Sequence, residues 1–359
     1  MGDLAVNVWV SPKWSHRLYR FVYNRVRRSP FINRIFHTIT QAPVTVKIAP
    51  YRWVYKKVVE SYAGRYTQVP PHLEINITNS CNAHCVMCPP AVHMGKDIMS
   101  KELYEKIVSQ AVEMGIGKLT LVGGEPLLDK NIYDKIRFAK TQGIRFVHMF
   151  TNGAALNEKN AEALLQTGLD SLTISIDSPF KEEYEQIRLG LNFDKVYANI
   201  VRFWEMKQAK KQAYPIVRIN MVEMSINEQS KAAFIKRFSP FADIVEVIPA
   251  HNFGGNEEIA DRNFTPDYLK ERSEHRFACN LLFSKIVIDA NGYVKKCSID
   301  YASHATFGDT NRHDLADIWK NEKFTSLRKR MLQGIFNEPG CKDCNHIQSW
   351  WIDAYSEAD

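Results

Sequence analysis

Three cysteines in this chain stand close enough together to share one metal centre. They lie in the segment Cys81-Asn-Ala-His-Cys85-Val-Met-Cys88. A cubane [4Fe–4S] cluster has four iron corners, and cysteine thiolates are its usual ligands. Three cysteines hold three corners and leave the fourth iron open. An open iron is needed by a cluster that activates a bound molecule, and it is not needed by a cluster that only carries electrons.

A zinc site is the alternative for the same segment, with His84 beside the cysteines. Adjacent residues such as His84 and Cys85 rarely both reach one tetrahedral ion, and structural zinc prefers paired Cys-x-x-Cys arms. The spacing therefore favours an iron–sulfur cluster.

The remaining four cysteines form a second candidate metal site, composed of Cys279, Cys297, Cys341 and Cys344. Four thiolates fully ligate one more cluster, although they would also suit a structural zinc ion. A disulfide framework is disfavoured because the total of seven cysteines is odd and the N-terminus lacks the pattern of a secretory signal. The presence of the first cluster favours iron and sulfide at the second site.

The first cysteine group follows a strand pattern, and more strands follow at regular intervals. From His72 to about Pro249 short apolar runs alternate with longer helical patterns. The expected strands are 73–78, 118–122, 146–151, 171–176, 216–222 and 244–249, and the expected helices are 101–114, 131–142, 158–167, 193–209 and 229–238. This rhythm predicts an α/β fold, a partial (β/α)6 TIM-like barrel, whose chemistry gathers at the C-terminal ends of its strands.

The C-terminal part has a different pattern. A hairpin is expected from 285–289 and 293–296, turned by Ala290-Asn291-Gly292, and a helix from 315 to 332. We therefore expect three parts: an N-terminal extension over residues 1–70, a core domain over 71–265 and a small cysteine-bearing domain over 266–359.

The cysteine triad after the first strand resembles the signature of the radical S-adenosylmethionine (SAM) superfamily. The position before the third cysteine is often aromatic in that family, and here it is Met87. The resemblance extends from residue 72 to about residue 345. It implies a SAM-binding [4Fe–4S] cluster on Cys81, Cys85 and Cys88, with SAM as the second cofactor.

Further motifs resemble the elements that hold SAM in this family. Gly123-Gly124-Glu125-Pro126, after the second strand, is similar to the element that binds the methionyl amino group. Asn152, Ser175 and Asp177 resemble positions near the ribose and the carboxylate of SAM. Arg188 matches an arginine that pairs with the carboxylate in related enzymes. An N-cap, a turn or a surface ion pair is the alternative for each of these four residues.

The C-terminal cysteines resemble an auxiliary domain of the SPASM and twitch types. The resemblance rests on the hairpin Gly292-Tyr-Val-Lys-Lys-Cys297, on Phe307-Gly308-Asp309 and on Cys341-Lys-Asp-Cys344. No cysteine follows Cys344, so the domain is similar to the form that holds a single auxiliary [4Fe–4S] cluster.

The resemblance implies reductive cleavage of SAM to a 5′-deoxyadenosyl radical, which abstracts a hydrogen atom from the substrate. If both clusters form, all seven cysteines serve as ligands and none is left to return a hydrogen atom, which disfavours a redox-neutral epimerase. We therefore expect an oxidoreductase that removes two electrons from a sugar-like or alcohol substrate, with the auxiliary cluster as electron acceptor. The base for the hydroxyl proton would be Glu223, Glu246 or His251, although a buried ion pair or a surface position is the alternative for each.

Two other classes of protein stay open. One is a peptide-modifying maturase, and the other is a non-catalytic protein that binds a membrane surface or nucleic acid and holds structural metals. We expect no nucleic-acid partner, since the open-site triad and Gly123–Pro126 point to catalysis. An electron donor such as flavodoxin or ferredoxin is expected.

The N-terminal extension is strongly basic. Residues 1–60 hold eleven Lys and Arg against two acidic residues, so they carry more positive charge than the whole chain, at +7. We expect a helix that packs its apolar face on the barrel. Peripheral membrane contact through residues 10–30, or attraction of phosphate-bearing substrates, is the alternative. Because the sequence shows no spanning apolar run, we expect a cytoplasmic protein.

Overall fold

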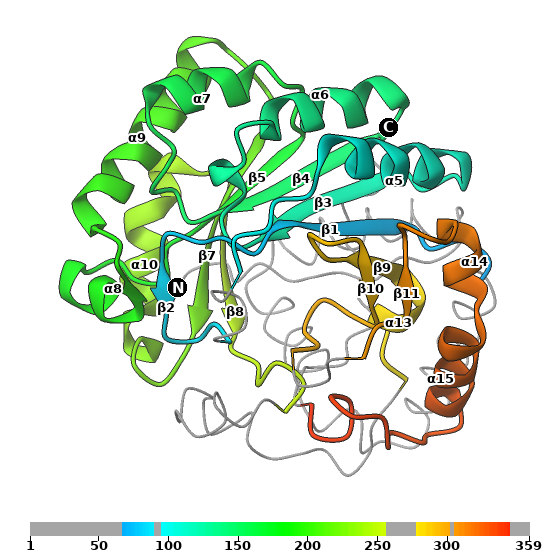
Figure 1. The fold of residues 1–359 in the computed structure, drawn as a ribbon. Helices are drawn as coiled ribbons and strands as arrows, with labels where there is room; N and C mark the ends of the chain where they lie inside the picture. Colours follow the sequence, from blue (N-terminus) through cyan, green and yellow to red (C-terminus); the bar gives the residue numbers. More distant parts are fainter. Residues whose placement is uncertain (1–66, 90–94, 256–277, 302–304, 345–359) are drawn as a thin grey trace, which may run out of the picture.

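A nine-stranded sheet organises the part of the chain that the computed structural model describes, which is residues 67–89, 95–255, 278–301 and 305–344. Its strand order is β11-β10-β9-β1-β3-β4-β5-β7-β8 (Figure 1). The strands are β1 (His72–Thr78), β3 (Lys118–Gly123), β4 (Phe146–Thr151), β5 (Ser171–Ser175), β7 (Ile216–Glu223), β8 (Ile244–Pro249), β9 (Lys285–Ile288), β10 (Tyr293–Lys295) and β11 (Gly308–Asp309). A separate two-stranded sheet joins β2 (His84–Cys85) to β6 (Arg188–Leu189).

Six parallel strands form the barrel-like core, as the sequence predicts. β1, β3, β4, β5, β7 and β8 are neighbours in that order, and every pair is parallel. Helices cover one face of the curved sheet (Figure 1). The predicted (β/α)6 fold class is confirmed, and each strand begins and ends within one residue of its predicted bounds.

The helices between these strands bury their apolar stripes against the sheet. They are α5 (Lys101–Glu113), α6 (Ile132–Gln142), α7 (Glu158–Leu165), α8 (Lys181–Ile187), α9 (Phe193–Ala209) and α10 (Lys231–Phe238), with 3-10 turns η2 (Pro126–Leu128), η3 (Glu228–Ser230) and η4 (Ser239–Phe241). α8 was not predicted, because its seven residues are too short for an apolar period and it has no capping side chain. No helix within the described ranges is both long and apolar enough to cross a membrane.

The two faces of the core sheet differ in polarity because side chains alternate along each strand. Leu73, Ile75 and Ile77 of β1 are fully buried in the apolar core. The opposite face carries polar pairs: His72 with Thr120, His148 with Thr173, Lys285 with Glu74, and Arg218 with Glu246. The face away from the helices is therefore a polar wall.

The C-terminal segment continues the same sheet. β9 pairs in parallel with β1, with His72 opposite Lys285 and Ile75 opposite Ile288. The predicted hairpin then turns through Gly292, whose φ of +88° suits glycine, and β10 pairs antiparallel with β9. The second cysteine segment is therefore attached directly to the strand that leads into the first.

The predicted single helix over 315–332 is wrong, because the chain forms two helices there. α14 (Leu315–Lys320) ends at Asn321, and α15 (Glu322–Leu332) begins after it. Asn321 is extended, at φ −63° and ψ 166°, and its side chain accepts the N–H of Phe324 as an N-cap. α14 packs beside α5, and a four-residue helix, α13 (Leu281–Ser284), precedes β9 (Figure 1).

A buried ion pair fastens the turn that follows β3. The Lys135 ammonium contacts a carboxylate oxygen of Asp129 at 2.7 Å and the carbonyl oxygen of Met99 at 2.5 Å, and both charged side chains are at most 2% exposed. Asp129 also accepts the N–H of Asn131. Since Asp129 stands four residues after Glu125, the pair ties Gly123–Pro126 to α5 and α6.

Replacing Asp129 by Asn should destabilise the fold strongly. Lys135 would then keep a buried charge without a counterion, which typically costs about 3–5 kcal/mol of the free energy of unfolding. Asp134→Asn is the matched control, because Asp134 pairs with Arg137 at the surface and should matter by less than about 1 kcal/mol. Urea unfolding of both variants measures the difference, and equal destabilisation would contradict the argument.

Candidate active site

The first three cysteines converge in the loop after β1. Cys85 is buried on the short strand β2, and the N–H of Cys88 donates to the Cys85 carbonyl at 3.0 Å, which folds the loop back. A hydrogen bond with the Cys88 thiol and the nearby Arg188 guanidinium together lower the pKa of Cys85 to about 7, against the opposing effect of burial. The Cys81 pKa is raised, first by burial and then by Cys85. The three sulfur atoms thus lie within electrostatic reach of one another, as ligands of one cluster must.

Arg188 brings a positive charge to these cysteines. The antiparallel pairing of β2 with β6 places Arg188 opposite Cys85, and its Nη1 donates to the Cys85 sulfur at 3.8 Å. Its Nη2 lies 2.6 Å from Oδ2 of Asp177, and both side chains are at most 7% exposed. The sequence assigned Arg188 to the SAM carboxylate, and the structure places it between a buried aspartate and a cluster ligand.

Asp177 fixes the position of the Arg188 side chain. Its backbone is left-handed, with φ +60°, and its Oδ1 accepts the N–H of Val222 at 2.8 Å. Its carbonyl accepts the Asn227 side-chain amide. Burial raises the Asp177 pKa, while Arg188 acts against this shift. The residue therefore orients Arg188 and joins the ends of β5 and β7.

Glu125 is the buried carboxylate of the site. Oε1 accepts the N–H of Leu127 at 3.0 Å and the hydroxyl of Thr151 at 2.8 Å, and Oε2 accepts the N–H of Asn152 at 2.7 Å. Burial raises the Glu125 pKa, and these three donors oppose the shift. Pro126 opens η2 directly after it. A cationic ammonium group would find a fixed, desolvated carboxylate at this position.

The glycine pair before Glu125 is required by chain packing. A Cβ on Gly124 would lie 2.0 Å from the carbonyl oxygen of Ser80, and one on Gly123 would lie 2.2 Å from that of Thr78. The N–H of Gly124 donates to the Thr78 carbonyl and that of Glu125 to the Ser80 carbonyl, at 2.7 and 2.8 Å. The absence of side chains on these glycines therefore admits the backbone that leads into Cys81.

The other two predicted cofactor residues lie at neighbouring strand ends. The Asn152 amide donates to Oδ1 of Asn82 at 2.7 Å and lies 4.0 Å from the Cys81 sulfur. Ser175 ends β5, paired in register with Asn220 of β7. Asn152 therefore belongs with the first cysteine loop, and Ser175 stands further round the sheet.

The four C-terminal cysteines also come together. Cys297 is buried after β10, and the charges of Cys279 and Cys341 reach its thiol. Burial raises the Cys341 pKa to about 11, while the nearby Lys296 acts against this shift. The N–H of Cys344 faces the Cys341 carbonyl at 3.4 Å. These contacts fit four thiolates around one cluster.

Within the described ranges, no three His, Cys, Asp or Glu side chains are arranged to hold a single metal ion. In a cubane each thiolate binds a different iron, so the thiolates need not share one ion. Both cysteine groups therefore fit clusters on the chemistry of their donors.

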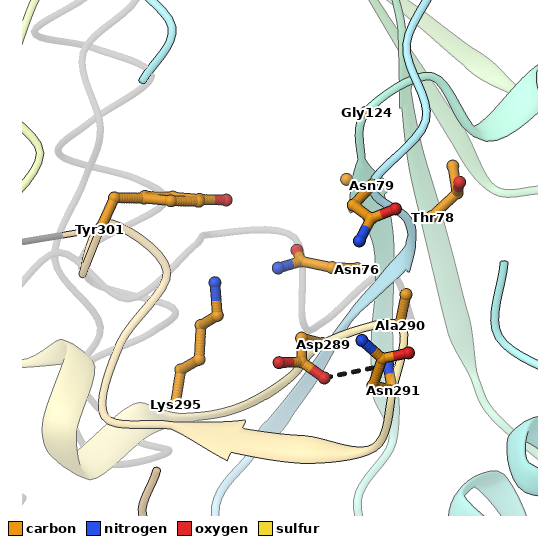
Figure 2. A pocket seen from close by; sticks show the side chains of 10 residues that line it. Asn76, Thr78, Asn79, Gly124, Asp289, Ala290, Asn291, Lys295 and Tyr301 are labelled. Carbon is orange, nitrogen blue, oxygen red and sulfur yellow. Dashed lines mark hydrogen bonds between the residues drawn. The ribbon is translucent and has the colours of Figure 1, made fainter. Parts of the chain in front are cut away.

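A polar cavity lies between the two cysteine groups. On the core side it is lined by Asn76, Asn79 and Gly124, and on the hairpin side by Asp289, Lys295 and Tyr301 (Figure 2). Gly124 touches the chain before Cys81, and Lys295 stands two residues before Cys297. The sequence reasoning missed Lys295 and Tyr301, although their closeness to a cysteine ligand in the hairpin was an available signal.

The three candidate bases are engaged elsewhere. Glu223 pairs with Lys231 at 2.7 Å, and Glu246 pairs with Arg218. Nδ1 of His251 faces the N–H of Phe253 at 3.3 Å. None of the three lines the cavity.

Gly124→Ala should displace the loop that carries Cys81, because its new Cβ meets a backbone carbonyl. After anaerobic reconstitution we expect iron to fall from about eight towards about four per chain. Gly117→Ala is the control, since its Cβ meets only the end of the flexible Arg145 side chain. Iron and sulfide analysis measures both, and full iron content in Gly124→Ala would refute this role of the glycine.

Curated relatives cover much of the chain. A GTP 3′,8-cyclase of Thermodesulfovibrio yellowstonii is 32% identical over 57% of this chain and 64% of that protein. A probable GTP 3′,8-cyclase of Methanococcus maripaludis is 27% identical over 77% of this chain and 99% of that protein. The matched part of the first relative is thus less than two thirds of its length.

These relatives overturn the reaction that we expected from the sequence. The prediction of a two-electron dehydrogenation of a sugar-like or alcohol substrate is wrong, because the relatives carry the name of a ring closure on GTP. The cysteine count reports which groups can accept an electron, and it does not report how a substrate radical reacts. Glu223, Glu246 and His251 were suggested as the base for that dehydrogenation, so the argument for them as bases no longer applies.

Solved structures show the same fold at low identity. BtrN, solved with AdoMet and 2-DOIA, is 20% identical with a TM-score of 0.53 and covers 79% of this chain and 98% of that one. SuiB of Streptococcus suis, solved with the precursor peptide SuiA, is 17% identical with a TM-score of 0.60 and covers 77% of this chain and 70% of that one. Likeness at this level shows the fold alone.

Two family models match the two cysteine-bearing parts. Residues 75–216 match the radical SAM superfamily, and residues 279–345 match the SPASM iron–sulfur cluster-binding domain. The cofactor predictions are thereby confirmed, with SAM, a SAM-binding [4Fe–4S] cluster and an auxiliary iron–sulfur cluster. The chain belongs to the radical SAM superfamily and carries a C-terminal SPASM domain.

Proposed function

We propose that this radical SAM enzyme cyclises a purine nucleotide of the GTP class. The proposal draws its substrate from the names of the curated relatives, one of which is matched over 99% of its length. The observation that carries it in this chain is the polar cavity between the two cysteine groups, with a lysine in its wall. The outcome is a rearrangement of the substrate skeleton rather than its net oxidation.

The bound cofactors supply one reaction step, which is a 5′-deoxyadenosyl radical able to abstract a hydrogen atom. The chain's own residues bind and orient. Cys81, Cys85 and Cys88 would hold the first cluster, and Glu125 would receive the methionyl ammonium. Arg188 would keep positive charge beside the cluster. An electron donor such as flavodoxin or ferredoxin would reduce it.

The cavity lies where a substrate could reach both cofactor sites. Its core-side wall includes Gly123 and Gly124, which precede Glu125, and its hairpin-side wall leads to Cys297. Its lining is amide, hydroxyl, carboxylate and ammonium groups, which suits a polar molecule better than an apolar one. Residues 1–66 lie outside the described residues, so the expected N-terminal helix on the barrel, and its alternative of contact with membrane or phosphate-bearing substrates through residues 10–30, stay predictions.

The direct test is product formation under anaerobic, reducing conditions. With SAM and GTP, the reconstituted enzyme should form 5′-deoxyadenosine faster than with SAM alone, together with a nucleotide product of the same mass as GTP. A Cys81→Ala/Cys85→Ala/Cys88→Ala variant should form neither. Liquid chromatography with mass spectrometry measures both compounds. If GTP, other purine nucleotides and guanosine all leave 5′-deoxyadenosine at its background level, the proposed substrate class is wrong.

Glu125→Gln should weaken SAM binding for two reasons. The amide carries no negative charge, and its NH₂ group faces one of the groups that donate a hydrogen bond to Glu125. A lost charge-assisted hydrogen bond corresponds to a roughly tenfold or greater rise in Kd. Glu113→Gln, an exposed carboxylate on α5, is the control. Equilibrium dialysis with labelled SAM gives the comparison, and equal affinities would remove Glu125 from the cofactor site.

A further inference from the structure

We propose that Lys295, Tyr301 and Asn76 form a phosphate-binding site in the cavity, which receives the phosphate chain of the substrate. The proposal rests on the nucleotide substrate class proposed above and extends it to named residues. The three side chains come from β10, from the segment after Cys297 and from β1, and Figure 2 shows them directed towards one space.

Lys295 is a half-buried cation with no ion pair within the described ranges. Its ammonium lies 4.3 Å from the centroid of the Tyr301 ring, a contact that leaves its N–H donors available. Neighbouring lysines differ: Lys296 pairs with Asp300 at 2.9 Å, and Lys285 pairs with Glu74 at 2.7 Å. The charges of Lys296 and Lys285 are therefore neutralised by ion pairs within the protein, whereas the Lys295 side chain points into the cavity.

The nearest acidic side chain in the cavity wall is committed to the hairpin turn. Oδ1 of Asp289 accepts the N–H of Asn291 and the N–H of Tyr293, both at 3.0 Å. Burial raises the pKa of Asp289, while those N–H groups and then Lys295 act against the shift. Asp289 therefore moderates the field around Lys295 without forming an ion pair with it.

Tyr301 and Asn76 add neutral donors beside the ammonium. Neither side chain has a hydrogen-bonding partner in the part of the chain that the structure describes, although both groups are half-buried. Burial raises the pKa of the Tyr301 hydroxyl, so it stays a donor at neutral pH. An ammonium, a hydroxyl and an amide together match the several acceptor oxygens of a phosphate.

The methionyl carboxylate of SAM is a second source of anionic oxygen near this cavity. Lys295 stands on β10, two residues before Cys297 of the second cysteine group, whereas Arg188 and Cys85 meet on β6 and β2. The phosphate of the substrate is therefore the oxyanion that we assign to Lys295, and the experiment below separates the two sources.

The test compares Lys295→Met with Lys320→Met in the anaerobically reconstituted enzyme, with SAM present and no reductant. Met keeps the length of the side chain and removes its charge. Lys320 is an exposed lysine at the end of α14, so its variant removes the same charge from the surface. Equilibrium dialysis measures binding of GTP, guanosine, inorganic tripolyphosphate and SAM, and iron content reports whether both clusters remain.

For Lys295→Met we expect the Kd of GTP and of tripolyphosphate to rise about tenfold to a hundredfold. The Kd of guanosine and of SAM should stay within about twofold of wild type, and Lys320→Met should behave as wild type. Lys295→Arg should regain most of the affinity for GTP. Tyr301→Phe, which keeps the ring under Lys295, should weaken GTP binding by a smaller factor.

Three results would overturn the proposal. They are unchanged GTP and tripolyphosphate affinity in Lys295→Met, an equal loss for guanosine, and a loss confined to SAM, which would assign Lys295 to the cofactor carboxylate. A failure of the nucleotide proposal gives a different result from these three. Wild type would then bind tripolyphosphate and no purine nucleotide, and Lys295→Met would bind tripolyphosphate more weakly than wild type. The phosphate site would stand in that case with another phosphorylated substrate.

Discussion

Backbone contact between two loops is the constraint on which the site depends. The turn after β3 and the loop after β1 approach so closely that two residues of the turn have no room for a side chain. Two hydrogen bonds, from Gly124 to Thr78 and from Glu125 to Ser80, fix this contact. This contact fixes the position of the buried Glu125 carboxylate relative to Cys81, the first cysteine ligand. A cofactor that needs both an iron and a carboxylate therefore meets them already in place.

The second organising feature is the parallel pairing of β9 with β1. It makes one sheet out of segments that are far apart in the sequence, and it puts a hairpin wall across from the cysteine loop. The cavity exists because of this pairing, since neither wall encloses it alone. Polar side chains held in pairs, such as His72 with Thr120, continue the polar wall along the face of the sheet away from the helices.

Much of this architecture could be predicted from the sequence, because it depends on local patterns. The strands from 146 to 151 and from 244 to 249 coincide with their predicted bounds, as does the helix from Phe193 to Ala209. The cysteine spacing and Gly123–Pro126 identified the cofactor chemistry. The single helix was mispredicted because Asn321 ends one helix by capping the next. The ion pair of Arg188 with Asp177, and the contact of Arg188 with Cys85 across β6 and β2, depend on folded geometry that no local pattern encodes. Lys295 and Tyr301 carry no periodic signal, and only the folded hairpin brings them to Asn76. The reaction itself was mispredicted because ligand count does not encode substrate shape.

The pairing of β9 with β1 also has a consequence for the order in which the chain assembles. His72 meets Lys285 only after the whole barrel segment between them has been synthesised, so this contact has a long sequence separation and forms late. Until then one edge of β1 exposes unpaired backbone groups, which is the usual route to edge-to-edge association of nascent sheets. Covering of the exposed β1 edge by β9 and completion of the cavity wall are thus the same structural event.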